Sequence, residues 1–211
     1  MRFLVAGEYL GTNSRTLKQF GKAKDLESLN LSSISTRSAD FSGLANLTKL
    51  KQLDVRDYRN LTDCDMTWAK EMKNLKAFRL KNNFRVTDKG LTLSNHARNL
   101  EQLMITKIGI DGSGLSEWPA DHAGTSILIE GCSITNDGVK AMSRLQNLKY
   151  LEVRVIRFGK GPIEVDVSCF ADSKTLESIS LLGQYTTSQE SLDRLIKARP
   201  DIGIFCNISE Q

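Results

Sequence analysis

The sequence has 211 residues, of which 40% are apolar and 26% are charged, and a formal net charge of +4. This balance is typical of a globular domain with a continuous core, and it argues against a disordered chain. No window approaches the roughly 18 apolar residues of a membrane span, and the four cysteines without a CxxC pair suit reduced thiols better than disulfides or a zinc site.

The chain begins with MRFLVAGEYLG, in which RFLV predicts a leading strand that ends near Val5. The apolar stretch before Glu8 is too short for the core of a secretory signal. If Met1 is the natural start, we therefore expect a cytoplasmic protein.

From residue 26 onwards an apolar frame, L-x-x-L-x-L, recurs along the chain. It reads LESLNL (26–31), LKQLDV (50–55), LKAFRL (75–80), LEQLMI (100–105), GTSILI (124–129), LKYLEV (148–153) and LESISL (176–181). The last positions of successive frames are 24, 25, 25, 24, 24 and 28 residues apart. Apolar and polar residues alternate at the end of each frame as in a half-buried strand, and a fixed period of this size indicates stacked repeats.

A turn motif follows several of these frames and precedes a segment with helical character. It reads VTDKGL (86–91), IDGSGL (110–115) and ITNDGV (134–139). Candidate N-caps are Thr87 or Asp88, Thr135 or Asn136, and Thr187, which has the spacing of a capping box with Glu190. Each repeat therefore pairs a strand with a helix or helical turn, and neither buries its apolar face without a neighbouring repeat.

Three later segments depart from the repeat. WPADHAG (118–124) predicts an irregular convex segment, FGKGPIEVDV (158–167) predicts an extra loop or small hairpin, and DIGIFC (201–206) predicts a closing strand. GKGP (159–162) lacks the spacing of a phosphate-binding loop and is interpreted as a turn. We expect one domain over 1–211, with a leading repeat or cap at 1–25, core repeats at 26–187, and a C-terminal helix and closing strand at 188–211.

With these frames and turns, residues from about 20 to 206 resemble the leucine-rich repeat family, in particular its bacterial and cysteine-containing types. Asn83 and Cys132 match the family's Asn/Cys position, where a buried side chain bonds to loop backbone. Other residues occupy this position elsewhere, namely Ile34, Tyr58, Ile108, Ile156 and Gln184. The resemblance implies an α/β fold, a curved right-handed solenoid with a parallel sheet on its concave side, and protein binding across that surface without a cofactor.

Catalytic chemistry has few candidate residues. The sequence holds only two histidines, His96 on a helical return and His122 in the irregular segment, and both are interpreted as surface residues. Cys132 is expected to be a buried structural thiol, because of its repeat position. An acid, a base and a nucleophile must lie within hydrogen-bond reach of one another, and nothing in the sequence brings such a set together. We therefore predict a non-enzyme without catalytic or metal-binding residues.

The residues that alternate with the buried frame positions predict the binding surface, because they point away from the core. In this surface Asp54 lies beside Arg79 and Glu130 beside Arg154, so that Arg56 and Lys81 remain as an unpaired cationic spot next to an apolar group. The predicted binding residues are Arg56, Arg79, Lys81, Met104, Leu128, Glu130, Tyr150, Glu152 and Arg154. Trp118 is a possible convex anchor for a partner, whereas Trp68 is expected to pack inside.

Charge is divided unevenly along the chain. Residues 1–108 hold 19 Lys/Arg and 11 Asp/Glu, a net charge of +8, and residues 109–211 hold 10 and 14, a net charge of −4. The first hypothesis is a module that binds a protein partner, as an inhibitor or an assembly subunit. The alternative is binding of nucleic acid or another acidic ligand by the basic half, although no docking motif or interleaved aromatics favour it. We expect a monomer or a weak homodimer formed through a free end strand.

Overall fold

Strands from successive repeats lie side by side in one parallel sheet. The computed structural model describes residues 2–6, 18–32, 40–155 and 161–209. The nine strands of the sheet, in spatial order, are β1 (Phe3–Ala6), β2 (Ser28–Ser32), β3 (Gln52–Arg56), β4 (Ala77–Lys81), β5 (Gln102–Thr106), β6 (Ser126–Glu130), β7 (Tyr150–Val155), β9 (Ser178–Gly183) and β11 (Gly203–Phe205). β1 and β11 match the predicted leading and closing strands.

The register is the same at every strand pair, so equivalent frame positions form straight rows across the sheet. Leu29 pairs with Leu53, Leu53 with Phe78, and the row continues to Ile204 in β11. The last frame positions are at most 1% exposed: Leu31, Val55, Leu80, Ile105, Ile129, Val153 and Leu181. The predicted alternation between buried and outward residues is therefore confirmed.

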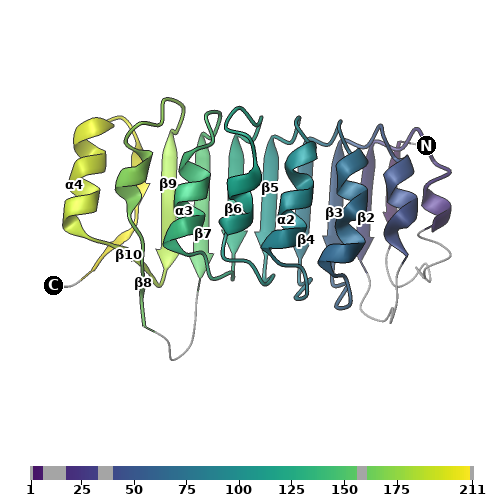
Figure 1. Cartoon of the computed structure of the whole chain (residues 1–211), viewed down its shortest axis with the longest axis horizontal. Helices are drawn as coiled ribbons and strands as arrows, with labels where there is room; N and C mark the ends of the chain where they lie inside the picture. The colour runs from purple at the N-terminus through teal and green to yellow at the C-terminus, as the bar shows by residue number, and fades with distance from the viewer. Residues whose placement is uncertain (1, 7–17, 33–39, 156–160, 210–211) are drawn as a thin grey trace.

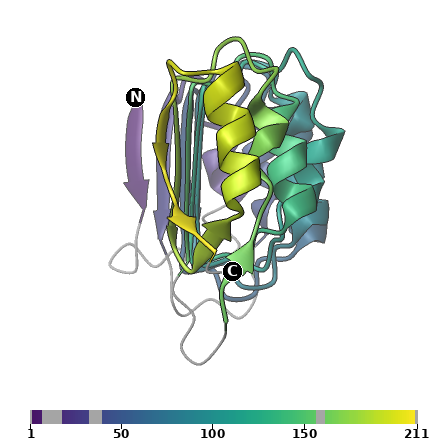
Figure 2. The ribbon, with the colours of Figure 1, turned by 90° about the vertical axis from the view of Figure 1, so that its left-hand side faces the viewer.

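Short helices cover one face of the sheet and return the chain to the start of the next strand (Figure 1). They are η2 (Phe41–Asn46), η3 (Asp63–Glu71), α2 (Asp88–Thr92), η4 (Leu93–His96), η5 (Ser113–Glu117), α3 (Asn136–Ser143), η6 (Val167–Phe170) and α4 (Gln189–Ala198). Five of these are 3-10 helices, a form suited to brief helical turns. The apolar core fills the space between the helix layer and the sheet (Figure 2).

The turn motif joins each repeat to the next by hydrogen bonds. Thr87 caps α2 by accepting the N–H of Lys89 at 3.3 Å, and Thr135 caps α3 by accepting the N–H of Gly138 at 3.4 Å. The carboxylate of Asp88 accepts the N–H groups of Asp111, Gly112 and Gly114 at 2.8–3.0 Å. These three donors belong to the following repeat, so the motif both starts its own helix and fixes its neighbour.

The last helix begins one residue later than the capping-box spacing suggests. Ser188, not Thr187, is the N-cap of α4, and its hydroxyl accepts the N–H of Ser191 at 3.2 Å. Thr187 is instead the last residue of β10 and is fully buried. The sequence does not distinguish the two candidates, because Thr187 and Ser188 are adjacent residues with hydroxyl groups. Thr187 belongs to the strand β10, so Ser188 becomes the N-cap.

A second, smaller sheet forms where the sequence predicts an extra loop or small hairpin. β8 (Ile163–Glu164), β10 (Tyr185–Thr187) and β12 (Asn207–Ile208) pair side by side, and both pairings are parallel. A hairpin is therefore wrong for the described part of 158–167, because the partner strand comes from the next repeat. Residues 158–160, which include the start of GKGP, lie outside the described residues, as do Ile34 and Ile156.

Polar side chains inside the core satisfy loop backbone between repeats. Asn83 is fully buried; its amide donates to the carbonyl oxygen of Val55 at 2.9 Å and accepts the N–H of Tyr58 at 3.1 Å. Cys132 is also buried, and burial raises the pKa of its thiol to about 11. The predicted structural role of both residues is confirmed, and the protonated thiol of Cys132 is a poor nucleophile at neutral pH.

Residues 118–124 form the irregular segment that the sequence predicts, but its aromatic residues are buried. Trp118 is 2% exposed and His122 is 1% exposed, and their rings stack with centroids 4.1 Å apart. The indole N–H of Trp118 donates to the carbonyl oxygen of Leu91 at 3.3 Å. The predictions of an exposed Trp118 anchor and a surface His122 are therefore wrong, because the two rings pack against each other and the indole N–H bonds to backbone of the preceding repeat.

The turn motif requires a glycine at position 138, because a side chain there would meet the backbone of the preceding repeat. A Cβ atom there would lie 2.2 Å from the carbonyl oxygen of Asp111 in the preceding repeat. Alanine favours helices by about 1 kcal/mol over glycine, yet we expect Gly138→Ala to lower the free energy of unfolding by about 1–3 kcal/mol through overpacking. Urea unfolding measures this change. Gly161→Ala, which meets nothing within 4 Å, is the control, and equal effects at both sites would contradict the contact.

The burial of His122 predicts an acid-sensitive fold. Desolvation lowers the pKa of His122 from 6.5 to about 4. Between these values the unfolded chain binds a proton that the folded chain does not, so stability is full above pH 6.5 and falls as the pH decreases towards 4. The loss should total about 3 kcal/mol for a shift of this size.

Denaturant unfolding of matched histidine variants across this pH range tests the source of the loss. His122→Gln should reduce the dependence of the free energy of unfolding on pH. His96→Gln, which changes an exposed histidine, should leave this dependence as in the wild type. An unchanged pH dependence of stability in His122→Gln would contradict the assignment of the loss to His122.

Candidate binding surface

The face of the sheet opposite the helices is the candidate site, here called the outer sheet face. No described helix covers this face (Figure 2). The outward residues of β2 to β7 and β9 lie on it, because they alternate with the buried ones. All nine residues predicted to bind a partner lie on this face: Arg56, Arg79, Lys81, Met104, Leu128, Glu130, Tyr150, Glu152 and Arg154. The sequence thus places them on the correct side of the sheet, but not always in the correct pairs.

Among the predicted binding residues, the ion pairs run along a strand and not between neighbouring strands. Asp54 is in register with Arg79, but its carboxylate binds Arg56 on its own strand, with Nε 2.7 Å from Oδ1 and a second contact from Nη2. Arg154 binds Glu152 at 2.9 Å. Side chains on a strand lean along the strand direction, which allows a long arginine to reach the carboxylate two residues before it. The prediction that Arg56 is unpaired is therefore wrong.

This pairing leaves β4 with two exposed cations. Arg79 and Lys81 stand two residues apart on the same side of the strand, and neither forms an ion pair within the described residues. Arg56 does not share this role, because Asp54 neutralises it and raises its pKa. Glu130, two strands away from Lys81 in the same row, also forms no ion pair in the described part of the chain. Cationic and anionic positions are thus separated by about 10 Å of sheet.

An apolar pair lies beside these charges. Met104 pairs with Arg79 on one side and with Leu128 on the other, so the apolar pair continues the row of Arg79 and lies next to the row of Lys81 and Glu130. Met104 and Leu128 are both half-buried. Tyr150 is 47% exposed but belongs to another row, in which it pairs with Ser126. The three residues are therefore neighbours on the face, but Tyr150 is not in line with the other two.

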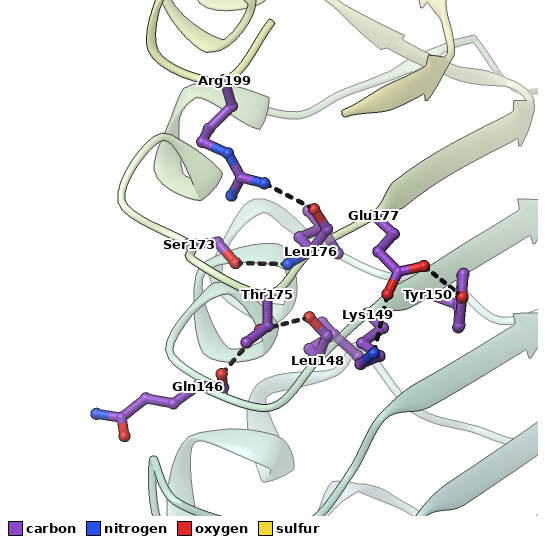
Figure 3. A network of polar contacts seen from close by, with 9 residues as sticks. All are labelled: Gln146, Leu148, Lys149, Tyr150, Ser173, Thr175, Leu176, Glu177 and Arg199. Atoms are coloured by element: carbon purple, nitrogen blue, oxygen red, sulfur yellow. Dashed lines mark hydrogen bonds and ion pairs between the residues drawn. The ribbon is translucent and has the colours of Figure 1, made fainter. Parts of the chain in front are cut away.

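A polar network at the start of the strands fixes Tyr150 (Figure 3). Its hydroxyl donates to the carboxylate of Glu177, which also binds Lys149 at 2.9 Å. Beside it, the Thr175 hydroxyl lies within hydrogen-bond distance of the carbonyl oxygens of Gln146 and Leu148, at 2.8 and 2.9 Å. Arg199 donates to the carbonyl oxygen of Leu176 at 3.0 Å. Tyr150 therefore presents a ring whose position is set before any partner binds.

A shallow hollow opens on the N-terminal part of the same face. Its volume is about 150 Å³, and it is lined by Phe3, Ser28, Leu29, Asn30, Gln52, Leu53, Asp54, Ala77, Arg79 and Gln102. The small side chain of Ala77, between Gln52 and Gln102 in one row, creates the gap. The hollow is smaller than the roughly 300–1,000 Å³ of small-molecule sites, so it suits a single side chain of a partner. Sequence reasoning places the polar lining residues and Ala77 on this face, but it predicts neither the hollow nor the participation of Phe3, Leu29 and Leu53.

The candidate catalytic residues His96, His122 and Cys132 do not lie together. His96 is exposed as expected, whereas His122 and Cys132 are buried in separate places. Within residues 2–6, 18–32, 40–155 and 161–209, no group of three or more His, Cys, Asp or Glu side chains is placed to hold a metal ion. Over the same ranges no helix has the length and apolar character needed to cross a bilayer.

Comparison with solved structures identifies the fold. The chain matches a leucine-rich repeat protein of Leptospira interrogans with a TM-score of 0.56 and 14% identity, over 89% of this chain and 50% of that one. It also matches an internalin of Listeria monocytogenes with a TM-score of 0.47 and 16% identity, over 90% of this chain and 64% of that one. The chain thus spans half of the first protein and less than two thirds of the second.

The likeness to the Leptospira protein, together with the parallel sheet and its helix layer, confirms the predicted leucine-rich-repeat solenoid. At this identity the likeness concerns the fold alone. No protein-family model matches the sequence, and no curated protein matches it.

Proposed function

We propose that this leucine-rich-repeat chain is a non-catalytic module that binds a protein partner through its outer sheet face. The observation that supports this most directly is the pair of exposed cations on β4, Arg79 and Lys81, beside the apolar pair Met104 and Leu128. An apolar group with charged neighbours on an uncovered sheet face is a typical protein contact surface. We further propose that the module acts as an inhibitor or as an assembly subunit.

The residues of the face would have different roles. Arg79 and Lys81 would attract acidic side chains of the partner, and long-range attraction of this kind raises association rates. Met104 and Leu128 would form the desolvated centre of the contact. The ion pairs Asp54–Arg56 and Glu152–Arg154 would lie at its rim, where they are already satisfied and contribute little affinity.

The sheet also supports this function through its rigidity. In the large sheet, β2 to β7 and β9 are each hydrogen-bonded to a strand on both sides, so the outward side chains start from fixed backbone positions. A surface ordered before binding loses little conformational entropy when a partner arrives. Tyr150, held by Glu177, is an example of a side chain ordered in this way.

Binding of nucleic acid by the basic half has less support. Several of its lysines lie in ion pairs at the start of the strands: Lys49 with Asp25 at 2.6 Å, and Lys51 with Glu27 and Lys76 with Glu101, both at 2.7 Å. These acids reduce the positive field that a phosphate backbone requires.

Charge reversal on β4 tests the proposed face. With a partner captured from the native lysate, then identified and purified, Arg79→Glu together with Lys81→Glu should weaken binding by about tenfold or more, because like charges would then face one another. The association rate should decrease, and added salt should no longer slow association, because the attraction that salt screens in the wild type is gone. Surface plasmon resonance measures both quantities.

The matched control reverses two exposed lysines on the helix side, Lys70→Glu with Lys73→Glu, and changes the net charge equally. It should alter affinity less than twofold, since single rim charges away from a contact contribute little. Equal losses in both double variants would indicate a general charge effect and contradict the assignment of the face.

Titration with unrelated duplex and single-stranded oligonucleotides tests the alternative. We expect no binding at physiological salt, because non-specific affinity comes from unpaired cations that release counterions. Fluorescence anisotropy measures it. Tight, salt-dependent binding that is lost in Lys49→Glu with Lys51→Glu would instead support a nucleic-acid function.

A further inference from the structure

Phe84 is an exposed aromatic residue in the interior of the repeat array. Six large apolar or aromatic side chains are exposed in the described part of the chain, and four of them belong to the first strand or to the last three elements: Phe3, Ile196, Phe205 and Ile208. The other two are Tyr150, which Glu177 holds, and Phe84, which is 57% exposed. Phe84 lies between β4 and α2, so its exposure does not depend on what covers the ends of the array.

The loop that carries Phe84 takes the chain from the sheet to the helix layer, at the carboxyl ends of the strands (Figure 1). The loop of the next repeat runs alongside it, since the N–H of Gly109 donates to the carbonyl oxygen of Val86 at 3.2 Å. A Cβ atom at Gly109 would lie 3.4 Å from the carbonyl oxygen of Phe84. Because position 109 has no side chain, it adds nothing that could cover the aromatic ring.

Exposed cations lie on both sides of this loop and continue onto the outer sheet face. The loop of the preceding repeat carries Arg59 and is joined to the Phe84 loop by a bridge between Thr62 and Arg85. Lys107 begins the loop of the next repeat. The exposed cations of this region are Arg59, Arg79, Lys81, Arg85 and Lys107. None of the five forms an ion pair with another residue that the structure describes.

Lys107 has a backbone conformation that lysine rarely adopts. The residue that follows each strand from β3 to β6 has a positive φ, and these residues are Asp57 at 62°, Asn82 at 56°, Lys107 at 52° and Gly131 at 69°. Glycine, asparagine and aspartate enter this left-handed region more readily than lysine does. A residue that is retained against the preference of the backbone suggests a function for its side chain. The aliphatic part of that side chain lies close to Gly131, where a Cβ atom would be 2.9 Å from Cγ of Lys107.

We propose that an acidic segment of the protein partner binds along these loops, here called the basic edge: Arg59, Lys81, Phe84, Arg85 and Lys107. An apolar residue of the segment packs on Phe84, and carboxylates on either side of it bind Arg85 and Lys107. Arginine suits this role because its guanidinium binds a carboxylate through two parallel N–H···O bonds. The inference rests on the proposed function, since the segment continues from the contact at Arg79 and Lys81 on the outer sheet face.

The acids of the same region favour a peptide over a phosphate chain or a lipid surface. Asp57, Asp63 and Asp111 lie in, or directly after, the loops that carry the cations. A nucleic-acid backbone bears a negative charge at every step, and an anionic bilayer spreads its charge over a plane. Either would meet these acids together with the cations. A peptide can place Asp or Glu opposite the cations and neutral residues opposite the acids.

Selection from a phage-displayed library of random peptides, with the full chain as bait, tests the proposal before the partner is known. The enriched peptides should carry several acidic residues, separated by neutral ones, beside an apolar or aromatic residue. Fluorescence anisotropy with synthetic copies of these peptides then gives dissociation constants for the wild type and its variants. Enriched peptides without acidic residues would overturn the proposal.

Two variants of the basic edge test its residues separately. Phe84→Ser should raise the dissociation constant by about tenfold, because an aromatic anchor contributes strongly to a contact, whereas Ile196→Ser, which changes an exposed apolar residue on α4, should change it by less than about twofold. Lys107→Asn should weaken binding several-fold but leave the urea midpoint of unfolding unchanged or higher, because asparagine tolerates a positive φ better than lysine. An unchanged dissociation constant in either edge variant would overturn the proposal.

Arg79→Glu together with Lys81→Glu separates this inference from the proposed function. Loss of peptide binding both here and in Phe84→Ser supports one contact across the face and the edge. Loss in the charge reversal alone would retain the outer sheet face and overturn the basic edge. Loss in Phe84→Ser alone would contradict the outer sheet face as the site, and loss in neither would contradict both proposals.

Single-stranded oligonucleotides and vesicles of phosphatidylserine and phosphatidylcholine serve as the other probes. Neither should bind in a manner that depends on Phe84. Binding of either probe that is lost in Phe84→Ser would overturn the acidic peptide as the occupant, because phosphate groups would then be the ligand of the basic edge.

Discussion

The structure depends on the close contact between successive repeats, which are held in one register by hydrogen bonds from strand to strand and from turn to turn. Neither a five-residue strand such as β4 nor a short helix such as α2 can bury its apolar side alone. Asp88 shows how closely the contact is specified, because one carboxylate binds three N–H groups of the next repeat. Glycine is needed at both 114 and 138, because the backbone of the preceding repeat passes too close to these positions for a side chain.

This constraint explains how much of the fold could be predicted from the sequence. Every buried strand position repeats the same environment, so the frame residues from Leu31 to Leu181 could be assigned by period alone. Tyr185 could not. Its hydroxyl accepts the N–H of Ile134 at 2.9 Å from a residue 51 positions earlier, a role comparable to that of Asn83. The burial of Trp118 and His122 could not be predicted either, because both lie in a segment that departs from the repeat and gives no periodic signal.

The candidate site was predictable to a lesser degree, for a related reason. Backbone register places Asp54 next to Arg79. However, the charged side chains on the outer sheet face are long, so they can bind groups other than their register partners. Arg56 therefore binds Asp54 along the strand, and the free cations become Arg79 and Lys81. The hollow depends on one small residue, Ala77, whose effect appears only when its neighbours on both strands are in place.

The same stacking determines where this protein can interact. Inside the array each repeat occupies the surface of the one before it, so partner binding is left to surfaces that stacking does not consume. The outer sheet face is such a surface, because the fold requires only that its side chains alternate with buried ones. Arg79 and Lys81 lie there beside Met104 and Leu128, so these charged and apolar groups remain available to a partner while the buried rows hold the repeats together.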